Sequence, residues 1–304
     1  MWTNYHCHTN YCDGKKSPAE VVTEAVKKNM LAIGLSSHAP LPFERFWCMK
    51  HDQLDSYLAD IDQLKKTAKN IEVYAGLEVD YIPETISPNH FIAKLDYTVG
   101  SVHFVDAFHG SNSEFDEGNR PYAGQRWEID GTSSLFFDGL QHIFGGDIKA
   151  AISRYFELTR EMVNTSPPDI LGHMDKIKMH NRDNKYFRES DAWYREEVLQ
   201  TLDSVRKAQM IIEVNTRGIY QKKTDTTYPS PWVLKEILDR GIPVTLSSDA
   251  HHPDDLVNHF PEAAAELMKI GFKKIRILLN GRWTDVAFNE NGIDTTTVRH
   301  YPMA

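Results

Sequence analysis

Short apolar runs that each end in a histidine, glutamate or aspartate constrain the fold of this chain more than any other feature. Residues 31–35 precede His38, and residues 71–77 precede Glu78. A short continuous apolar run is what a parallel strand buried on both faces requires. Burial of such strands does not need a polar side chain at their ends, so the repeated pattern indicates a shared site.

Amphipathic helical segments alternate with these strands. The first helix is expected to begin at Ser17, because a capping serine followed by Pro18 is a typical helix start. Further helices are expected at about residues 52–69, 147–163, 191–208, 231–240 and 254–269. Further strands are expected at about residues 2–7, 95–101, 169–173, 210–215, 242–246 and 274–279. No long Pro/Gly/Ser linker interrupts the series, so residues 1–304 are expected to form a single domain.

One stretch, at about residues 104–146, breaks the alternation. It is rich in Gly, Asn, Ser, Asp and aromatic residues and shows no sustained period. We interpret it as a long loop insertion. Loops of this length in a compact domain are usually lids or binding loops, and a poorly ordered surface excursion is the alternative.

Parallel strands that alternate with helices form either a barrel or an open doubly wound sheet. In a barrel the C-terminal ends of all strands converge on one site, whereas an open sheet keeps its first and last strands apart. The candidate residues all stand at or just after the C-terminal ends of expected strands: His6, His8, His38, Glu78, His103, His173, Asp249 and His251. The sequence also lacks the Gly-rich phosphate loop typical of doubly wound sheets. We therefore predict a barrel.

Charge and composition exclude several partners. The formal net charge is −9, with 34 Lys and Arg against 43 Asp and Glu, which argues against a nucleic-acid binder. No apolar run approaches the length of a membrane span, so no membrane partner is expected. The three cysteines, Cys7, Cys12 and Cys48, do not suggest a disulfide framework, and we expect a reducing, cytoplasmic location. The oligomeric state stays open.

The N-terminal residues form the first candidate metal site. His6 and His8 are separated by one residue at the end of a strand, so both rings point to the same face and can bind one ion. Asp13 lies on a tight turn, from which its carboxylate can reach a second ion. Strand alternation points Cys7 away from the metals, whereas Cys12 either approaches them or is a small buried side chain.

Six motifs together resemble the polymerase-and-histidinol-phosphatase (PHP) superfamily, and within it the stand-alone histidinol-phosphate phosphatases. In chain order the motifs are His6-Cys7-His8-Thr9 with Asp13-Gly14, Ser37-His38-Ala39-Pro40, Gly76-Leu77-Glu78, Gly100-Ser101-Val102-His103, Leu171-Gly172-His173-Met174-Asp175 and Ser248-Asp249-Ala250-His251. The resemblance implies an α/β fold, a distorted (β/α)7 TIM-like barrel of the PHP type. It also implies a cluster of divalent ions.

The resemblance further implies how the ligands are shared among three ions. One ion would be held by His6, His8, Glu78 and Asp249. A second would share Glu78 and add His103 and His173, and a third would take Asp13, His38 and His251. We expect two to three divalent ions, Zn, Fe or Mn.

Such a cluster suits phosphate-ester hydrolysis, in which ions neutralise the phosphoryl oxygens and acidify a water. We predict a phosphomonoesterase that hydrolyses L-histidinol phosphate, a small-molecule phosphate ester, to L-histidinol and phosphate. A metal-held hydroxide is the expected nucleophile, without a covalent intermediate. Glu78 is expected to bridge two ions, and Asp13 or His251 to protonate the leaving group.

Substrate contacts are expected outside the metal cluster. The cations placed to reach the phosphate are Arg154, Lys176, Lys178 and Arg217, each of which is otherwise a solvated side chain. Within the long loop, Trp127 is expected to contact the imidazole of the substrate, and Asp130 with Glu128 to meet its amine. Glu213, inside a strand, is interpreted as a residue at the edge of the core or beside a ligand.

Three alternatives remain. The runner-up is a PHP-type phosphodiesterase or nuclease, which the acidic charge disfavours, or a phosphatase acting on another small phosphate ester. A metal-dependent amidohydrolase shares the His-x-His start but gives no reason for Asp13 and His38. A non-catalytic member of the superfamily would be expected to have lost ligands, and this chain keeps every motif position.

Overall fold

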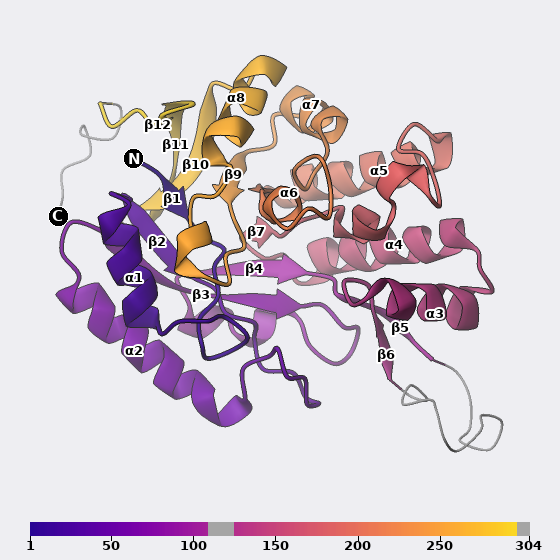
Figure 1. The fold of residues 1–304 in the computed structure, drawn as a ribbon, viewed down its shortest axis with the longest axis horizontal. Helices are drawn as coiled ribbons and strands as arrows, with labels where there is room; N and C mark the ends of the chain where they lie inside the picture. The colour runs from indigo at the N-terminus through magenta and orange to yellow at the C-terminus, as the bar shows by residue number, and fades with distance from the viewer. Residues whose placement is uncertain (109–124, 297–304) are drawn as a thin grey trace.

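The computed structural model describes residues 1–108 and 125–296. Its centre is a parallel seven-stranded sheet that curves into a barrel (Figure 1). In spatial order the strands are β1 (Thr3–Asn4), β2 (Ala32–Leu35), β3 (Glu72–Asp80), β4 (Tyr97–Ser101), β7 (Ile170–Leu171), β8 (Ile211–Asn215) and β9 (Val244–Ser247). A parallel bridge between Cys7 and Ala250 brings the two edges together beyond the ends of β1 and β9. The predicted distorted barrel is therefore confirmed, and it is nearly closed.

Helices follow the strands as the sequence pattern indicated. They are α1 (Pro18–Lys27), α2 (Leu54–Thr67), α4 (Ile148–Thr165), α5 (Ala192–Ala208), α7 (Pro231–Asp239) and α8 (Phe260–Ile270). Most begin and end within two residues of the expected bounds; the exception is α8, which was expected from about residue 254 and begins at Phe260. The short helix α6 (Arg217–Tyr220) was not predicted. Short 3-10 turns are η1 (His51–Gln53), η2 (Pro88–His90), η3 (Ile92–Lys94), η4 (Lys176–His180), η5 (Arg182–Asn184) and η6 (Pro253–Asp255).

Helix α1 shows why the local prediction succeeded. The Ser17 hydroxyl accepts a hydrogen bond from the backbone N–H of Glu20, and the Glu20 carboxylate accepts one from the backbone N–H of Ser17. This reciprocal capping satisfies donors that the helix itself cannot. Val21, Val22 and Ala25 are buried, so the apolar stripe of α1 packs on the core while its charged residues face outward.

The interpretation of residues 104–146 as a long loop was wrong for the part of this stretch that the structure describes. Strands β5 (Phe104–Ala107) and β6 (Arg126–Glu128) pair in an antiparallel hairpin, and helix α3 (Ser133–Phe144) follows. The strands are short and irregular, so they leave no detectable period in the sequence. Helix α3 does begin with a local signal, because the Thr132 hydroxyl accepts from the Leu135 N–H. Residues 109–124 lie outside the described residues.

A small antiparallel sheet covers the N-terminal end of the barrel. It contains β10 (Lys274–Leu279), which was predicted, and β11 (Arg282–Asn289) and β12 (Gly292–Ile293), which were not. Tyr5 joins this sheet to the barrel, because its hydroxyl donates to the Leu278 carbonyl at 2.8 Å and accepts from the Leu278 N–H at 2.9 Å.

The barrel interior is filled at this end. The Tyr97 hydroxyl donates to the Tyr5 carbonyl at 2.8 Å. A Cβ atom at Gly34 would lie 2.3 Å from the Tyr97 oxygen, and one at Gly76 would lie 2.3 Å from its ring. The two glycines therefore leave room for an aromatic ring across the barrel. Since this end is packed, a ligand can enter only at the C-terminal ends of the strands.

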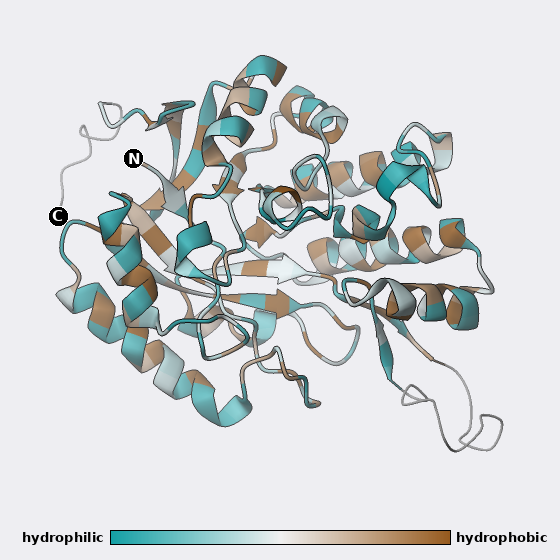
Figure 2. Ribbon diagram, viewed as in Figure 1, coloured by the Kyte–Doolittle hydropathy of each residue, from teal (hydrophilic) through white to brown (hydrophobic). Residues whose placement is uncertain are grey.

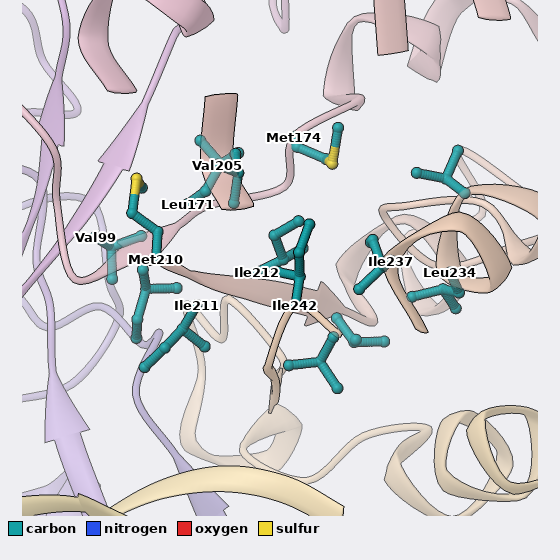
Figure 3. Packing of buried hydrophobic residues seen from close by; sticks show 14 of the residues in the cluster. Val99, Leu171, Met174, Val205, Met210, Ile211, Ile212, Leu234, Ile237 and Ile242 are labelled. Carbon is teal, nitrogen blue, oxygen red and sulfur yellow. The ribbon is translucent and has the colours of Figure 1, made fainter. Parts of the chain in front are cut away.

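Apolar side chains fill the layer between the barrel and its outer helices. Figure 3 shows this packing around β8, with Val205 from α5 and Leu234 and Ile237 from α7. Along the outer helices, such as α2, hydrophilic residues alternate with hydrophobic ones, as expected for one buried and one solvated face (Figure 2). Among the described residues, no helix combines the length and apolar character needed to cross a bilayer.

Candidate metal centre

The C-terminal strand ends bring all nine predicted ligands together. Most of these side chains are buried, and only Asp13 and His251 are partly exposed. His6 and His8 follow β1, His38 follows β2, and Asp249 and His251 follow β9. Residues from the first and last strands thus meet at the point where the barrel closes. An open sheet could not produce this arrangement.

Glu78 lies at the centre of the cluster. Its Oε2 atom is 3.0 Å from His38 Nδ1 and 3.1 Å from His6 Nε2. Its Oε1 atom is 2.9 Å from His173 Nε2 and 3.5 Å from His103 Nε2. The two carboxylate oxygens therefore face different sets of imidazoles. Such an arrangement would suit a carboxylate shared between two ions, and Glu78 lies inside β3 rather than after it.

The outer part of the cluster lies around Asp13. His251 Nε2 is 3.2 Å from Asp13 Oδ1, and His38 Nε2 is 4.0 Å from the same oxygen. Ligand atoms of His8, Asp13, His38 and His251 all lie within 4.8 Å of one another. His38 also groups with Glu78 through its other ring nitrogen. It therefore stands between the Asp13 and Glu78 sites, a sharing that the resemblance did not imply.

Unsatisfied atoms inside the cluster fit divalent cations. His6 Nε2, His38 Nδ1, Glu78 Oε2 and Asp13 Oδ1 are buried, and although they lie close to other ring nitrogens and carboxylate oxygens, none of them makes a well-aligned hydrogen bond within the described residues. A buried polar atom without a partner costs free energy, typically about 1–3 kcal/mol. Imidazole nitrogens and carboxylate oxygens are ligands of Zn, Fe and Mn. A bound ion would satisfy these atoms together, so the residues present fit divalent ions.

Electrostatics keep the carboxylates of the cluster ionised. Burial alone would raise the pKa of Glu78, but His6, His38 and other imidazoles lower it well below its usual range. Burial likewise opposes ionisation of Asp249, whereas the charges of His6 and Arg217 hold its pKa well below the usual value. Both carboxylates are therefore anionic at neutral pH.

Two buried carboxylates orient the imidazoles from outside. Glu213 Oε1 is 2.6 Å from His6 Nδ1, and Glu213 Oε2 accepts from the His173 backbone N–H at 2.7 Å. Asp80 Oδ1 is 2.9 Å from His103 Nδ1. A carboxylate on Nδ1 fixes the proton there and leaves Nε2 free to bind a metal. From the sequence, Glu213 was interpreted only as a residue at the edge of the core or beside a ligand. Its role could have been inferred more closely from its position, because a glutamate inside an otherwise apolar, buried strand needs a polar partner.

A third support holds the segment that carries Asp249 and His251. Asp249 adopts a left-handed backbone conformation, with φ of 51°, which is unfavourable for a residue other than glycine. Arg217 Nη1 donates to the Asp249 carbonyl at 2.6 Å, and the Tyr220 hydroxyl donates to the Ser248 carbonyl at 2.8 Å. Helix α6, which the sequence did not predict, thus stabilises two of the ligands.

A cavity of about 250 Å³ opens beside the ligands. Asp13, His38, Asp249 and His251 line its inner side, and its other walls are formed by Phe46, Trp47, Glu128, Asp130, Gly131, Lys176, Met179, Arg217, Gly218, Gln221, Lys223 and Tyr228. Both aromatic and charged side chains therefore face the space next to the cluster. This is the composition of a small-molecule site.

Of the predicted substrate contacts, Lys176, Arg217, Glu128 and Asp130 lie at the cavity. Lys176 Nζ is 2.9 Å from Asp130 Oδ2 and 3.2 Å from His103 Nε2. Burial lowers the pKa of Lys176, but Asp130 outweighs this and holds the ammonium charged. Asp130, expected to meet the substrate's amine, is thus already paired with a cation. The sequence could not predict this pairing, because Asp130, in the turn after β6, and Lys176, at the start of η4, are far apart along the chain.

Three other predicted contacts lie elsewhere. Trp127 is buried to 1 % exposure and packs against Phe136, with a ring-centroid distance of 5.2 Å, so it belongs to the core. Lys178 Nζ bonds to Asp175 at 2.7 Å within a buried network. Arg154 pairs with Glu157 at 2.8 Å. None of the three predicted residues lines the cavity, and these predictions were wrong.

The cysteines follow strand alternation. The Cys7 thiol donates to the Gly34 carbonyl at 3.2 Å, away from the ligands, as predicted. Cys12 Sγ lies 3.5 Å from His8 Nδ1. Cys12 therefore approaches a candidate ligand through the ring nitrogen that faces away from Glu78.

Comparisons with known proteins agree with the fold and with the family resemblance. The sequence pattern of the PHP domain matches residues 4–217. A protein of Deinococcus radiodurans named "Probable histidinol-phosphatase" is 27% identical over 280 residues, which cover 89% of this chain and 94% of that protein. The histidinol-phosphatase of Bacillus subtilis is 25% identical over 276 residues, which cover 83% of this chain and 94% of its own length. The crystal structure of a Lactococcus lactis histidinol phosphate phosphatase complexed with zinc, L-histidinol and phosphate superposes with a TM-score of 0.64. It is 21% identical, and the match covers 96% of this chain and 98% of that one.

Proposed function

Since the chain belongs to the PHP-domain family, we propose that it is a metal-dependent phosphomonoesterase that hydrolyses L-histidinol phosphate to L-histidinol and phosphate. The observation that carries this proposal is the convergence of the ligand atoms on Glu78 beside a cavity that also holds Lys176 and Arg217. Divalent ions and buried cations in one small space suit a doubly charged phosphate ester.

The proposed ligands are the nine residues of the cluster: His6, His8, Asp13, His38, Glu78, His103, His173, Asp249 and His251. We propose two to three ions of Zn, Fe or Mn, with Glu78 shared between two of them. When bound, the ions supply charge neutralisation at the phosphoryl group and acidification of a water molecule. The cluster geometry supports this assignment because each Glu78 oxygen faces its own group of imidazoles.

The side chains at the cavity position the phosphate. Lys176 is held charged by Asp130, and Arg217 is held by the Asp249 carbonyl. Each cation is therefore fixed before the substrate arrives, which reduces the ordering that binding requires. The cavity wall also carries Glu128 and Asp130. Asp130 is already paired with Lys176, so we assign the contact with the substrate's ammonium group to Glu128, which pairs with Arg45 through Oε1.

His251 is the better candidate for protonating the leaving group. Burial raises the pKa of Asp13, but the neighbouring His251, with His38 and His8, lowers it well below its usual value. An ionised carboxylate accepts protons or binds a metal and has no proton to donate. We therefore assign Asp13 to metal binding. His251 Nε2 lies 3.2 Å from Asp13 Oδ1, and its Nδ1 accepts from Arg217, so Nε2 would either bind an ion as the ninth ligand or carry the proton for the leaving oxygen, but not both at once.

A phosphate-release screen tests the proposal. The metal content of the purified protein is measured, and the protein is then assayed against histidinol phosphate, sugar phosphates, phosphotyrosine and short oligonucleotides. We expect the highest kcat/KM for histidinol phosphate, with one oxygen from labelled water in the released phosphate. A preference for oligonucleotides would favour the phosphodiesterase alternative, and a trapped phosphoenzyme would contradict hydrolysis without a covalent intermediate.

A further inference from the structure

Phe46 is the most exposed large apolar side chain among the described residues, and it lines the cavity beside the metal centre. Its exposed fraction is 92%, whereas the other exposed large apolar side chains range from 38% to 50%. A single exposed apolar residue on a plain surface needs no explanation. Phe46 differs because it stands at the cavity, where a bound molecule could cover it.

The backbone of Phe46 is fixed by a turn. The Cys48 N–H donates to the Arg45 carbonyl at 3.2 Å, so Phe46 and Trp47 occupy the central positions of the turn. Cys48 is buried, which anchors the end of the turn in the core. The phenyl ring therefore projects from a defined position although the ring itself is solvated.

The residues on both sides of Phe46 are held by one hairpin. Arg45 Nε donates to Glu128 Oε1 at 2.5 Å. The Arg45 guanidinium lies 5.6 Å from the Phe104 ring centroid, and Trp47 stacks on the same ring at 5.7 Å. Glu128 on β6 and Phe104 on β5 thus clamp the turn against the hairpin.

The position of Trp47 indicates the direction from the candidate ligands to the cavity mouth. Its ring contacts His38 at a centroid distance of 4.6 Å and His103 at 5.8 Å, so its edge lies against the ligands. Phe46 is the next residue and is solvated. A phosphate held at the ligands would therefore leave the rest of an ester to extend past Trp47 toward Phe46.

We propose that Phe46 contacts the aromatic ring of the leaving group and selects ring-bearing phosphate esters, in the role that the sequence had suggested for Trp127. This inference rests on the proposed function, in which the ring is the imidazole of histidinol phosphate. A phenyl face can stack on a ring but cannot form a hydrogen bond, so Phe46 would discriminate by the presence of a ring in the substrate. The amine of the substrate would be bound by a carboxylate of the cavity wall.

Replacing Phe46 by alanine tests the inference with two substrates. For Phe46→Ala, kcat/KM for histidinol phosphate should fall about two- to tenfold, mainly through KM, because one aromatic contact is lost. Ethanolamine phosphate, which keeps the amine but lacks a ring, should be hydrolysed as by the wild type. The melting temperature should not change, since the removed ring is solvated. Phe46→Tyr keeps the ring and should restore most of the lost kcat/KM.

Phe137→Ala is the matched control, because Phe137 is 49% exposed on α3 and does not line the cavity. It should change neither substrate. A binding measurement that needs no turnover completes the test: calorimetry should show weaker L-histidinol binding to Phe46→Ala, and unchanged binding to Phe137→Ala.

The outcomes separate the inference from the function beneath it. A wild-type protein that does not hydrolyse histidinol phosphate overturns the proposed function and the inference with it. An active wild type combined with equal losses on both substrates, or with no loss for Phe46→Ala, overturns the assignment of Phe46 alone.

Discussion

Replacing Glu213 by glutamine should weaken metal binding although Glu213 is not one of the candidate ligands. The carboxylate receives three hydrogen bonds, from His6 Nδ1 at 2.6 Å, from the His173 N–H at 2.7 Å and from Asn215 Nδ2 at 3.1 Å. Burial raises the pKa of Glu213, but His6 outweighs this and lowers it, so the wild-type group is an anion. All three partners donate hydrogen bonds to this side chain. Both of its terminal atoms must therefore be acceptors, as the two oxygens of a carboxylate are.

Glutamine has the same shape but one of its two terminal atoms is a donor. If its NH2 group faces His6, the ring must move its proton to Nε2, which then cannot bind a metal. If the NH2 group faces His173, two donors meet at a distance that had been a hydrogen bond. Loss of one hydrogen bond to a charged group costs about 1.5–3 kcal/mol. Glu213→Gln should therefore lower metal affinity roughly ten- to a hundredfold.

A competition titration against a chromophoric chelator measures the effect. Glu189→Gln is the control, because Glu189 Oε2 accepts from Trp232 Nε1 at 2.6 Å, outside the metal centre, and its loss should leave metal affinity unchanged. Circular dichroism confirms that both variants are folded. A folded Glu213→Gln protein whose metal affinity lies within about twofold of the wild type would refute the argument that this carboxylate sets the proton of His6.

Three further predictions concern the ions, the cavity and pH. Active protein should carry two to three divalent ions by elemental analysis, and His103→Ala and Asp13→Ala should remove different ones; at most one ion in active protein would contradict the cluster. Asp130→Asn should lower kcat/KM roughly tenfold for both histidinol phosphate and an aryl phosphate, because the substitution removes the carboxylate that pairs with Lys176. A loss confined to histidinol phosphate would show instead that Asp130 contacts only the amine of the substrate. In the metal-free protein, burial lowers the pKa of His103 but Asp80, with Asp130 and Glu78, outweighs it and raises the pKa from 6.5 to about 9. The imidazolium stabilises the metal-free fold below pH 6.5, and this contribution is lost as the pH rises through about 9. Metal affinity should rise over the same pH range, because the ion no longer has to displace the proton of His103. A metal affinity that does not depend on pH in this range would argue against His103 as a ligand.

Local sequence signals determined most of the barrel and the positions of its ligands. The capping box at Ser17 and Glu20 located the start of α1, and the apolar runs located β2, β3, β4 and β8. These signals succeed because helix capping and strand burial act between residues that are close in the chain. The candidate ligands could be predicted for the same reason, since each one stands at or just after the end of an expected strand.

The tertiary structure decided which polar side chains serve the site and which serve the core. Trp127 is an aromatic residue of the kind that contacts a substrate ring, but α3 packs over it. A Cβ atom at Gly139 on α3 would lie 2.2 Å from the Trp127 ring. Lys178 and Lys176 are equally basic and two residues apart. One faces Asp175 in the interior and the other faces Asp130 at the cavity. Nothing local distinguishes them, because their partners come from different elements.

Long-range pairing explains the remaining differences. Glu213 and His6 share a hydrogen bond across 207 residues of sequence. Whether a buried carboxylate meets an imidazole, an ammonium or only apolar atoms depends on how separate strands come together when the barrel closes. The sequence by itself therefore determined the barrel strands, the candidate ligands and the family resemblance. Only the folded barrel decided their partners, because an ionic or hydrogen-bonded contact acts over a few ångströms and its two members are brought that close by packing alone.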